Sequence, residues 1–156
     1  MRTKILILFY MTIRKATTTD IPRLLEIFAS AREYMKVKGN PTQWGDSYPE
    51  ISFIEDDIAQ GDCYACIENE VVVATFVLRE GNDPTYEKIY DGAWKNGNPY
   101  VTIHRIASAG QTRGVFSNAV RFALQNHKTI RIRQSLAPIK SVTPDPRHAF
   151  RNLNGF

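Results

Sequence analysis

The fold is decided by residues 100–120, which have the sequence YVTIHRIASAGQTRGVFSNAV. Residues 100–107 have the composition of a strand, and a short glycine-containing loop follows at 108–112. Apolar residues then recur at helical spacing from Val115 onward. Because the first backbone N–H groups of a helix have no partner inside it, a helix that begins directly after such a loop can bind an anion. This stretch therefore predicts a strand, a phosphate-binding loop and a helix in succession.

Helices and strands are also expected on either side of this stretch. A long helix should open near Asp20, because Thr17 and Asp20 have the spacing of a capping box, and should stop at 39–41. Residues 79–99 are rich in turn-forming residues and predict a long loop. The expected strands are 12–16, 62–67, 71–78 and 129–133. The expected shorter helices are 51–60, one from about 113, and 146–154.

Length and composition favour one folded domain. The chain has 156 residues and is 43% hydrophobic, which is enough for a single core. Residues 1–10 begin like a signal peptide, but no small-residue cleavage site follows and the apolar run is too short to span a bilayer. We therefore expect an N-terminal extension at 1–11 and one domain at 12–156, located in the cytoplasm and not in a membrane.

The two cysteines form a single Cys-x-x-Cys motif at Cys63 and Cys66. Such a motif can indicate zinc binding or thiol redox chemistry. It lies in a predicted strand, however, where residues three apart point to opposite faces, and no second cysteine pair completes a zinc site. We interpret both cysteines as small core residues in a reducing compartment, and expect no metal.

Charge is distributed unevenly along the chain. Residues 101–156 contain nine Lys or Arg and one acidic residue, Asp145, within a total net charge of +4. A basic C-terminal half suits a polyanion, either the phosphates of a nucleotide cofactor or a nucleic acid, although it can equally be a solvated basic surface. Few aromatic residues are interleaved with these basic residues, so we expect no nucleic acid partner.

Specific motifs resemble the GNAT superfamily of N-acetyltransferases. Gln111-Thr112-Arg113-Gly114 is similar to the first four positions of its acetyl-CoA signature, Arg or Gln-x-x-Gly-x-Gly or Ala, and lies between the expected strand and helix. The order of elements over residues 12–134 is similar as well. The strings at 40–46, 83–86, 91–94 and 103–108 resemble a bacterial GNAT subgroup of uncharacterised acceptor. The resemblance implies an α/β fold with a mixed, mostly antiparallel central sheet and helices on both faces.

The resemblance also implies acetyl transfer from acetyl-CoA to a primary amine of a small molecule or peptide. A base is then needed to deprotonate the amine, and His104 is our first candidate, the alternative being a histidine merely packed on the sheet. The residues expected to bind the cofactor are Ile106, Ala107, Ser108, Gln111, Thr112, Arg113, Gly114, Val115, Phe116 and Ser117. The residues expected to bind the amine are Trp44, Asp46, Tyr48, Tyr86 and Trp94, since aromatics and acids suit a cation, unless this loop only packs its own aromatics.

Two departures from the family pattern are evident. Phe116 stands where the signature has a small residue, so its bulk could crowd a pyrophosphate. The tail at 134–156 is atypical: two C-terminal strands are expected to be missing, and Arg151 replaces a tyrosine that many members use as general acid. These departures favour, as an alternative, a catalytically impaired protein that binds acyl-CoA. They leave open a truncated or frameshifted gene product and a homodimer in which a partner chain covers the sheet edge.

Overall fold

The computed structural model describes residues 11–81, 99–110, 112–133 and 150–153. Six strands form one sheet in the order β1-β2-β3-β4-β5-β6. Neighbouring strands are antiparallel except β4 and β5, which are parallel. The mixed, mostly antiparallel sheet that the resemblance to the GNAT superfamily implies is therefore confirmed. The elements are β1 (Thr12–Lys15), a 3-10 turn (Thr18–Asp20), α1 (Ile21–Val37), α2 (Ile51–Ala59), β2 (Cys63–Glu68), β3 (Val71–Glu80), β4 (Val101–Ser108), α3 (Val115–Leu124), β5 (Ile130–Arg133) and β6 (Phe150–Leu153).

The long helix α1 begins where the capping pattern predicts. The backbone N–H of Thr17 donates to Asp20 Oδ2 at 2.8 Å, and the Asp20 N–H donates to the Thr17 carbonyl at 2.9 Å. Arg14 holds the same carboxylate through two hydrogen bonds of 2.7 and 2.9 Å. Hydrogen bonding to Arg14 lowers the pKa of Asp20 to about 2. The start of α1 is thus tied to β1 by an ion pair as well as by its cap.

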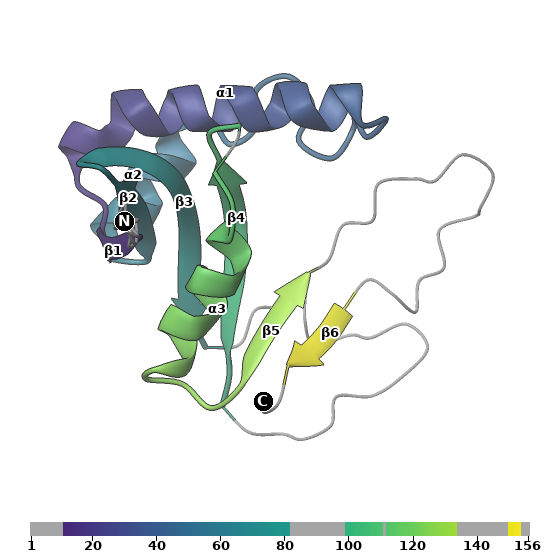
Figure 1. Ribbon diagram of the computed structural model, residues 1–156. Coiled ribbons are helices and arrows are strands. Elements are labelled where there is room, and N and C mark those ends of the chain that lie inside the picture. Colours follow the sequence, from purple (N-terminus) through teal and green to yellow (C-terminus); the bar gives the residue numbers. More distant parts are fainter. Residues whose placement is uncertain (1–10, 82–98, 111, 134–149, 154–156) are drawn as a thin grey trace, which may run out of the picture.

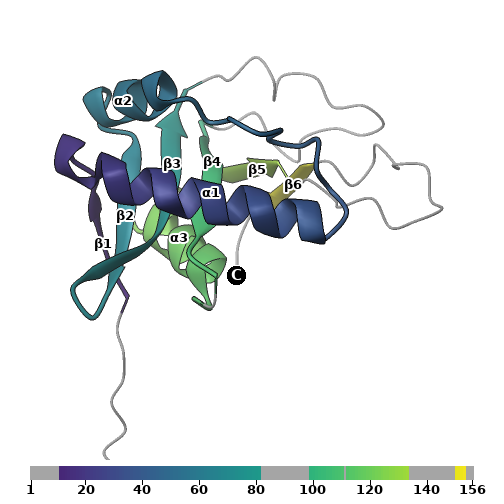
Figure 2. The same cartoon turned by 90° about the horizontal axis from the view of Figure 1, so that it is seen from above.

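The helices cover both faces of the sheet, as the resemblance to the GNAT superfamily implies. One hydrophobic cluster joins α3 to the sheet and includes Phe76, Ile103 and Ala119. The other joins α1 and α2 to the sheet and includes Leu24 and Ile54. Figure 1 shows α1 running across β3 and β4, and Figure 2 shows α2 and α3 on opposite sides of the sheet. No helix among the described residues is both long and apolar enough to cross a bilayer.

The two cysteines lie on opposite faces of β2. Cys63 belongs to the cluster under α1 and α2, whereas Cys66 belongs to the cluster under α3. Both are buried and free. Burial raises the pKa of Cys63 to about 11 and that of Cys66 to about 12. The interpretation of the pair as core residues is confirmed, because thiols on opposite faces cannot share a bond or a metal ion.

The sequence prediction fails near the C-terminus. The helix expected at 146–154 is wrong over Phe150–Leu153, which form β6 and pair antiparallel with β5 from Ile130↔Leu153 to Arg133↔Phe150. A free strand edge offers backbone hydrogen bonds that a short, weakly periodic segment does not gain as an isolated helix. Tertiary pairing therefore overrides the local pattern here. Residues 134–149 lie outside the described part of the chain.

Candidate functional site

The candidate site is organised around an irregularity in β4. Val77 lies opposite His104, and Thr75 lies opposite Ala107, so β4 carries one residue more than β3 over this interval. Arg105, within the bulge, has a left-handed φ of 45°. A β-bulge bends its strand and re-aims the side chain of the extra residue. The side chain of Arg105 accordingly reaches α2, on the same face of the sheet as Ala107.

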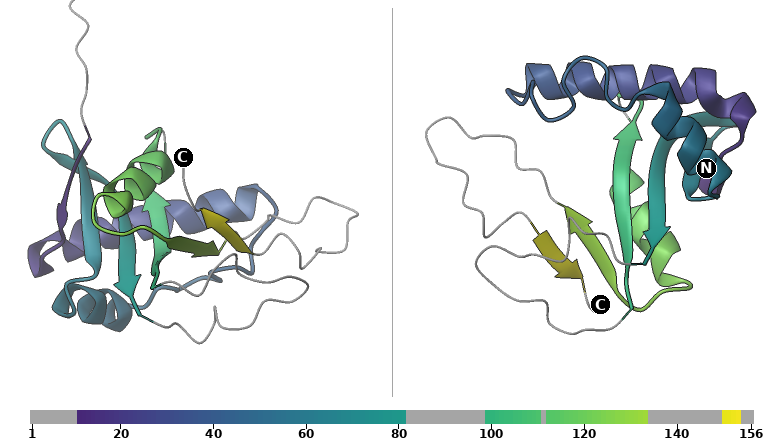
Figure 3. Two further views of the ribbon diagram at one scale, coloured as in Figure 1. Left: turned by 90° about the horizontal axis from the view of Figure 1, so that it is seen from below. Right: turned by 180° about the vertical axis from the view of Figure 1, so that it is seen from behind.

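Beyond this bulge, β4 separates from β5. Among the described residues, the two strands pair only at Val101↔Ile130, Thr102↔Arg131 and Ile103↔Ile132. Figures 1 and 3 show the ends of β4 and β5 splaying apart. The segment 104–108 therefore lies past the last β5 pairing, at an opening in the sheet. Three of the predicted cofactor-binding residues, Ile106, Ala107 and Ser108, lie in it.

Helix α3 begins close after this opening. Its N-cap residue is Gly114, with a left-handed φ of 74°, and the Asn118 N–H closes the first turn on the Gly114 carbonyl at 2.9 Å. The Asn118 side chain donates to the same carbonyl at 2.8 Å. Val115 packs into the core, whereas Phe116 is 47% exposed. The bulk that the sequence places at position 116 thus lies on the helix surface and not in the core. Gln111 lies outside the described residues.

His104 is half-buried and is held by its neighbour on β4. Its Nε2 lies 2.9 Å from Thr102 Oγ1. Thr102 is fully buried, and its hydroxyl is 3.4 Å from the carbonyl of Arg79. The His104 ring therefore has a defined orientation on the face of the sheet that carries α2.

A buried ionic cluster lies next to His104, and sequence reasoning missed it. Asp57 of α2 accepts hydrogen bonds from Arg105 at 2.6, 2.6 and 2.9 Å and from Arg79 at 2.7 Å. The Asp57 side chain is 3% exposed and that of Arg105 13%. Burial alone would lower the pKa of Arg105, but hydrogen bonds to Asp57 and Tyr48 outweigh it and the pKa is raised. One signal was available: Asp57 follows Ile54 by three positions, on the buried face of the helix.

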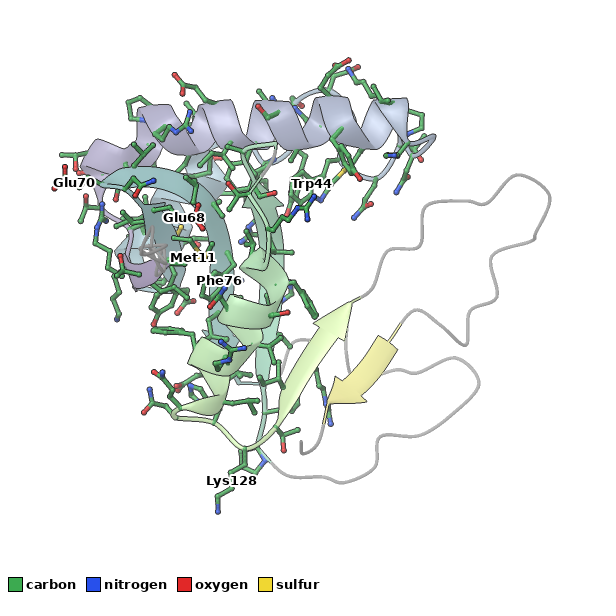
Figure 4. The ribbon with its side chains drawn as sticks, viewed as in Figure 1. Met11, Trp44, Glu68, Glu70, Phe76 and Lys128 are labelled. Atoms are coloured by element: carbon green, nitrogen blue, oxygen red, sulfur yellow. The ribbon has the colours of Figure 1, made fainter. Side chains whose placement is uncertain are left out.

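Part of the predicted amine-binding set comes together on this face. Tyr48 accepts a 2.8 Å hydrogen bond from Arg105 Nη1, and its ring lies 6.1 Å from that of Trp44 and 5.7 Å from that of Phe53. Trp44 also contacts Phe28 of α1 edge-on at 5.7 Å. Figure 4 shows Trp44 just beneath α1. These aromatics do pack on one another, as the alternative interpretation expects, while the Tyr48 hydroxyl reaches the β4 bulge.

The other predicted amine-binding residues do not join this group. The Asp46 side chain is 90% exposed and pairs with Lys36 near the end of α1 at 2.8 Å. Tyr86 and Trp94 lie outside the described residues. Among the residues that the structure describes, no cluster of three His, Cys, Asp or Glu side chains is placed to hold a metal ion.

Solved structures with the same arrangement of elements identify the fold. An acetyltransferase of the GNAT family from Streptococcus agalactiae is 29% identical, with a TM-score of 0.68 over 80% of this chain and 77% of that chain. This chain has the GNAT fold. A GNAT-family acetyltransferase from Listeria monocytogenes is 18% identical, with a TM-score of 0.60 over 78% of this chain and 75% of that chain.

A more distant GNAT structure was solved with a ligand. The GNAT-family acetyltransferase from Brucella melitensis, in complex with acetyl-CoA, is 13% identical and has a TM-score of 0.55 over 94% of this chain and 88% of that chain. At this identity the likeness concerns the fold alone. By sequence, the chain matches no protein-family model and no curated protein. The likeness to the Streptococcus agalactiae structure nevertheless confirms the resemblance to the GNAT superfamily that the motifs indicate.

Proposed function

We propose that this protein is an N-acetyltransferase that moves the acetyl group of acetyl-CoA to a primary amine of a small molecule or peptide. The observation that carries the proposal is the opening between β4 and β5, next to a helix that begins at left-handed Gly114. The likeness to the Streptococcus agalactiae acetyltransferase and the acetyl-CoA complex of the Brucella melitensis protein support it. Acetyl-CoA, when bound, supplies an activated thioester carbonyl.

The residues at the start of α3 fit a diphosphate. By helix geometry, the N–H groups of Val115, Phe116 and Ser117 have no acceptor within the helix. Arg113, Gly114 and Ser117 are exposed, so an anion can reach this turn from solvent. One exposed charge gains only about 0.3 to 1 kcal/mol from a helix end, so affinity requires several N–H bonds together. We assign this role to residues 111–117.

The free part of β4 fits the remainder of the cofactor. We propose that backbone N–H groups around Ile106, Ala107 and Ser108 bind its amide-bearing arm, because this segment lies past the last β5 pairing. One of these groups would also donate to the carbonyl oxygen as negative charge develops there. A rigid backbone donor is effective in this role, because it needs no reorganisation during the reaction.

His104 is proposed as the base. The amine must lose a proton before it attacks, since an ammonium has no lone pair and a free amine has a pKa near 10. Histidine suits this step, directly or through a water molecule, because the unperturbed pKa of an imidazole, about 6.5, lies near neutrality. We propose that Trp44, Asp46, Tyr48, Tyr86 and Trp94 contribute to the amine site. Of these, Trp44 and Tyr48 lie in the aromatic group that contacts the β4 bulge.

The proposal is tested by titrating the protein with acetyl-CoA and by measuring thiol release across a panel of primary amines. We expect saturable binding and amine-dependent CoA release. His104→Gln should keep the affinity for acetyl-CoA and lower turnover by about 10² to 10⁴, the usual contribution of a general base. Absence of acetyl-CoA binding would refute the proposal, and unchanged turnover in His104→Gln would remove His104 from it.

A protein that binds acyl-CoA without turnover is the second candidate. It is favoured by the exposed Phe116 ring on the first turn of α3, where the family signature has a small residue. Saturable binding without thiol release for any amine would indicate this function. Phe116→Ala would then distinguish a crowded cofactor site from a missing catalytic group, because it relieves crowding without adding a base.

A further inference from the structure

We propose that Arg105, anchored by the buried carboxylate of Asp57, is a positioning residue that presents the Tyr48 hydroxyl to the amine substrate as a hydrogen-bond donor. The preferred substrate is then an amine that carries a carbonyl or carboxylate oxygen close to its nitrogen. This inference rests on the proposed function, because it assigns the amine site to the face of β4 that carries His104.

The bulge in β4 brings Arg105 to that face. Ile103 packs in the cluster under α3, so regular alternation would turn His104 to the other face and Arg105 back toward α3. The guanidinium instead contacts Asp57 of α2, on the α1 and α2 side of the sheet. The left-handed φ of 45° at Arg105 marks the point where alternation breaks. The side chains of His104 and Arg105 consequently lie on the same face of the sheet, the one that carries α1 and α2, although the two residues are neighbours in sequence.

Asp57 determines where the guanidinium lies. Its two oxygens accept three hydrogen bonds from Arg105 and one from Arg79, which uses the roughly four acceptor positions of a carboxylate. The two arginines differ in their other contacts. Arg105 continues to Tyr48 at 2.8 Å, whereas Arg79 continues to Asp62 at 3.3 Å. Arg79 is therefore a matched control: it binds the same carboxylate but does not touch Tyr48.

The hydrogen bond from Arg105 leaves the hydroxyl hydrogen of Tyr48 able to donate a hydrogen bond to another group. A guanidinium has donors and no acceptor, so the Tyr48 oxygen must accept the hydrogen bond and its own hydrogen must point elsewhere. The ring contacts those of Trp44 and Phe53, and the Tyr48 carbonyl accepts from Arg32 at 3.2 Å. Tyr48 thus has a hydroxyl of fixed position whose only O–H donor is not used by Arg105.

A fixed donor selects substrates by what they can accept. An amino acid, an amino-acid amide or a peptide N-terminus carries an oxygen two bonds from the carbon that bears the amine. A polyamine or a plain alkylamine carries no such oxygen. A site that offers a hydrogen bond discriminates against analogues that cannot complete it, because its polar group is left unpaired. We therefore expect glycinamide and a short peptide to be better substrates than spermidine or propylamine.

The test is a double-mutant cycle between Tyr48→Phe and Arg105→Gln, with Arg79→Gln as control. The readouts are kcat/KM for glycinamide and for propylamine, and KM for acetyl-CoA. We expect Tyr48→Phe and Arg105→Gln each to lower the ratio of kcat/KM for glycinamide to kcat/KM for propylamine about tenfold, the cost of one hydrogen bond, while KM for acetyl-CoA changes less than about twofold. The double variant should resemble either single variant, and Arg79→Gln should change glycinamide less than about twofold.

The proposal is overturned if the two losses multiply, if Tyr48→Phe leaves glycinamide unaffected, or if propylamine is preferred. If Arg105→Gln does not fold, the double variant Asp57→Asn/Arg105→Gln replaces it, because it places two neutral side chains where the buried ion pair was. The single variant Tyr48→Phe still tests the substrate preference by itself. The proposed function fails separately, when wild-type protein releases no CoA with any amine. In that case the contact itself is tested by the ¹³Cζ resonance of Tyr48, which should move in Arg105→Gln and stay in Arg79→Gln; the reverse result overturns it.

Discussion

The guanidinium of Arg105 meets the carboxylate of Asp57 across 48 residues of sequence, with its Nη2 2.6 Å from both carboxylate oxygens and its Nε 2.9 Å from one. Both side chains are largely out of contact with water. The pair joins β4 to α2 next to the opening at β5. It therefore links the stability of the fold to the geometry of the candidate site.

Asp57→Ala should be among the most destabilising substitutions outside the apolar core. It leaves Arg105 buried without its carboxylate, and breaking a buried ion pair in this way costs about 3 to 5 kcal/mol. Urea unfolding followed by tryptophan fluorescence measures the loss. Asp62→Ala is the control, because among the described residues the Asp62 carboxylate pairs with the partly exposed Arg79, and it should cost about 1 kcal/mol or less. Equal losses would contradict the assigned importance of Asp57.

The Arg14–Asp20 pair should make stability depend on pH at the acid end. The folded-state pKa of Asp20 is lowered to about 2, below the 3.8 of the unfolded chain, so its contribution is complete above about pH 4 and disappears as pH falls toward 2. Urea midpoints measured between pH 6 and pH 2.5 should fall less steeply for Asp20→Asn than for the wild type. If the difference in urea midpoint between the wild type and Asp20→Asn stays constant across this pH range, the ionised Asp20 carboxylate does not make this contribution to stability.

The two thiols should be inert in the folded protein. The pKa values of about 11 for Cys63 and about 12 for Cys66 leave almost no thiolate at pH 8, and both sulfurs are buried. A disulfide-exchange reagent should label neither thiol in native protein and both in urea. Fast labelling of either cysteine without denaturant would show that the sheet around β2 opens readily or is packed differently.

Alanine substitutions at two glycines distinguish the effect of backbone strain on stability from an effect on cofactor binding. Gly114 and Gly39 both have left-handed φ angles, 74° and 83°, so an alanine at either position should cost about 1 to 2 kcal/mol of stability. Only Gly114 lies at the start of α3, where a Cβ would come 3.4 Å from Asn118 Nδ2. Titration with acetyl-CoA should show weaker binding for Gly114→Ala and unchanged binding for Gly39→Ala. Equal affinities would remove the α3 N-terminus from the cofactor site.

Local sequence patterns determined most of the elements. The capping pair Thr17 and Asp20 predicted the start of α1 to within one residue, and the apolar run from Val71 predicted β3. The alternation around Cys63 and Cys66 predicted that they face opposite sides of the sheet, as they do. These features depend on residues a few positions apart, and helical or strand periodicity encodes them directly.

Only the tertiary structure decided the bulge at Arg105, the partners of the Asp57 carboxylate and the pairing of Phe150–Leu153 with β5. In sequence, Asp57 follows Glu55 and Asp56 and resembles them, but only Asp57 lies on the helix face that packs against the sheet. Its partners Arg79 and Arg105 are 22 and 48 residues away. Periodicity carries no information on which distant charges meet, because burial of an ion pair depends on how whole elements pack. Asp57 and Arg105 were for this reason missed in the sequence, whereas Trp44 and Tyr48 were predicted from it.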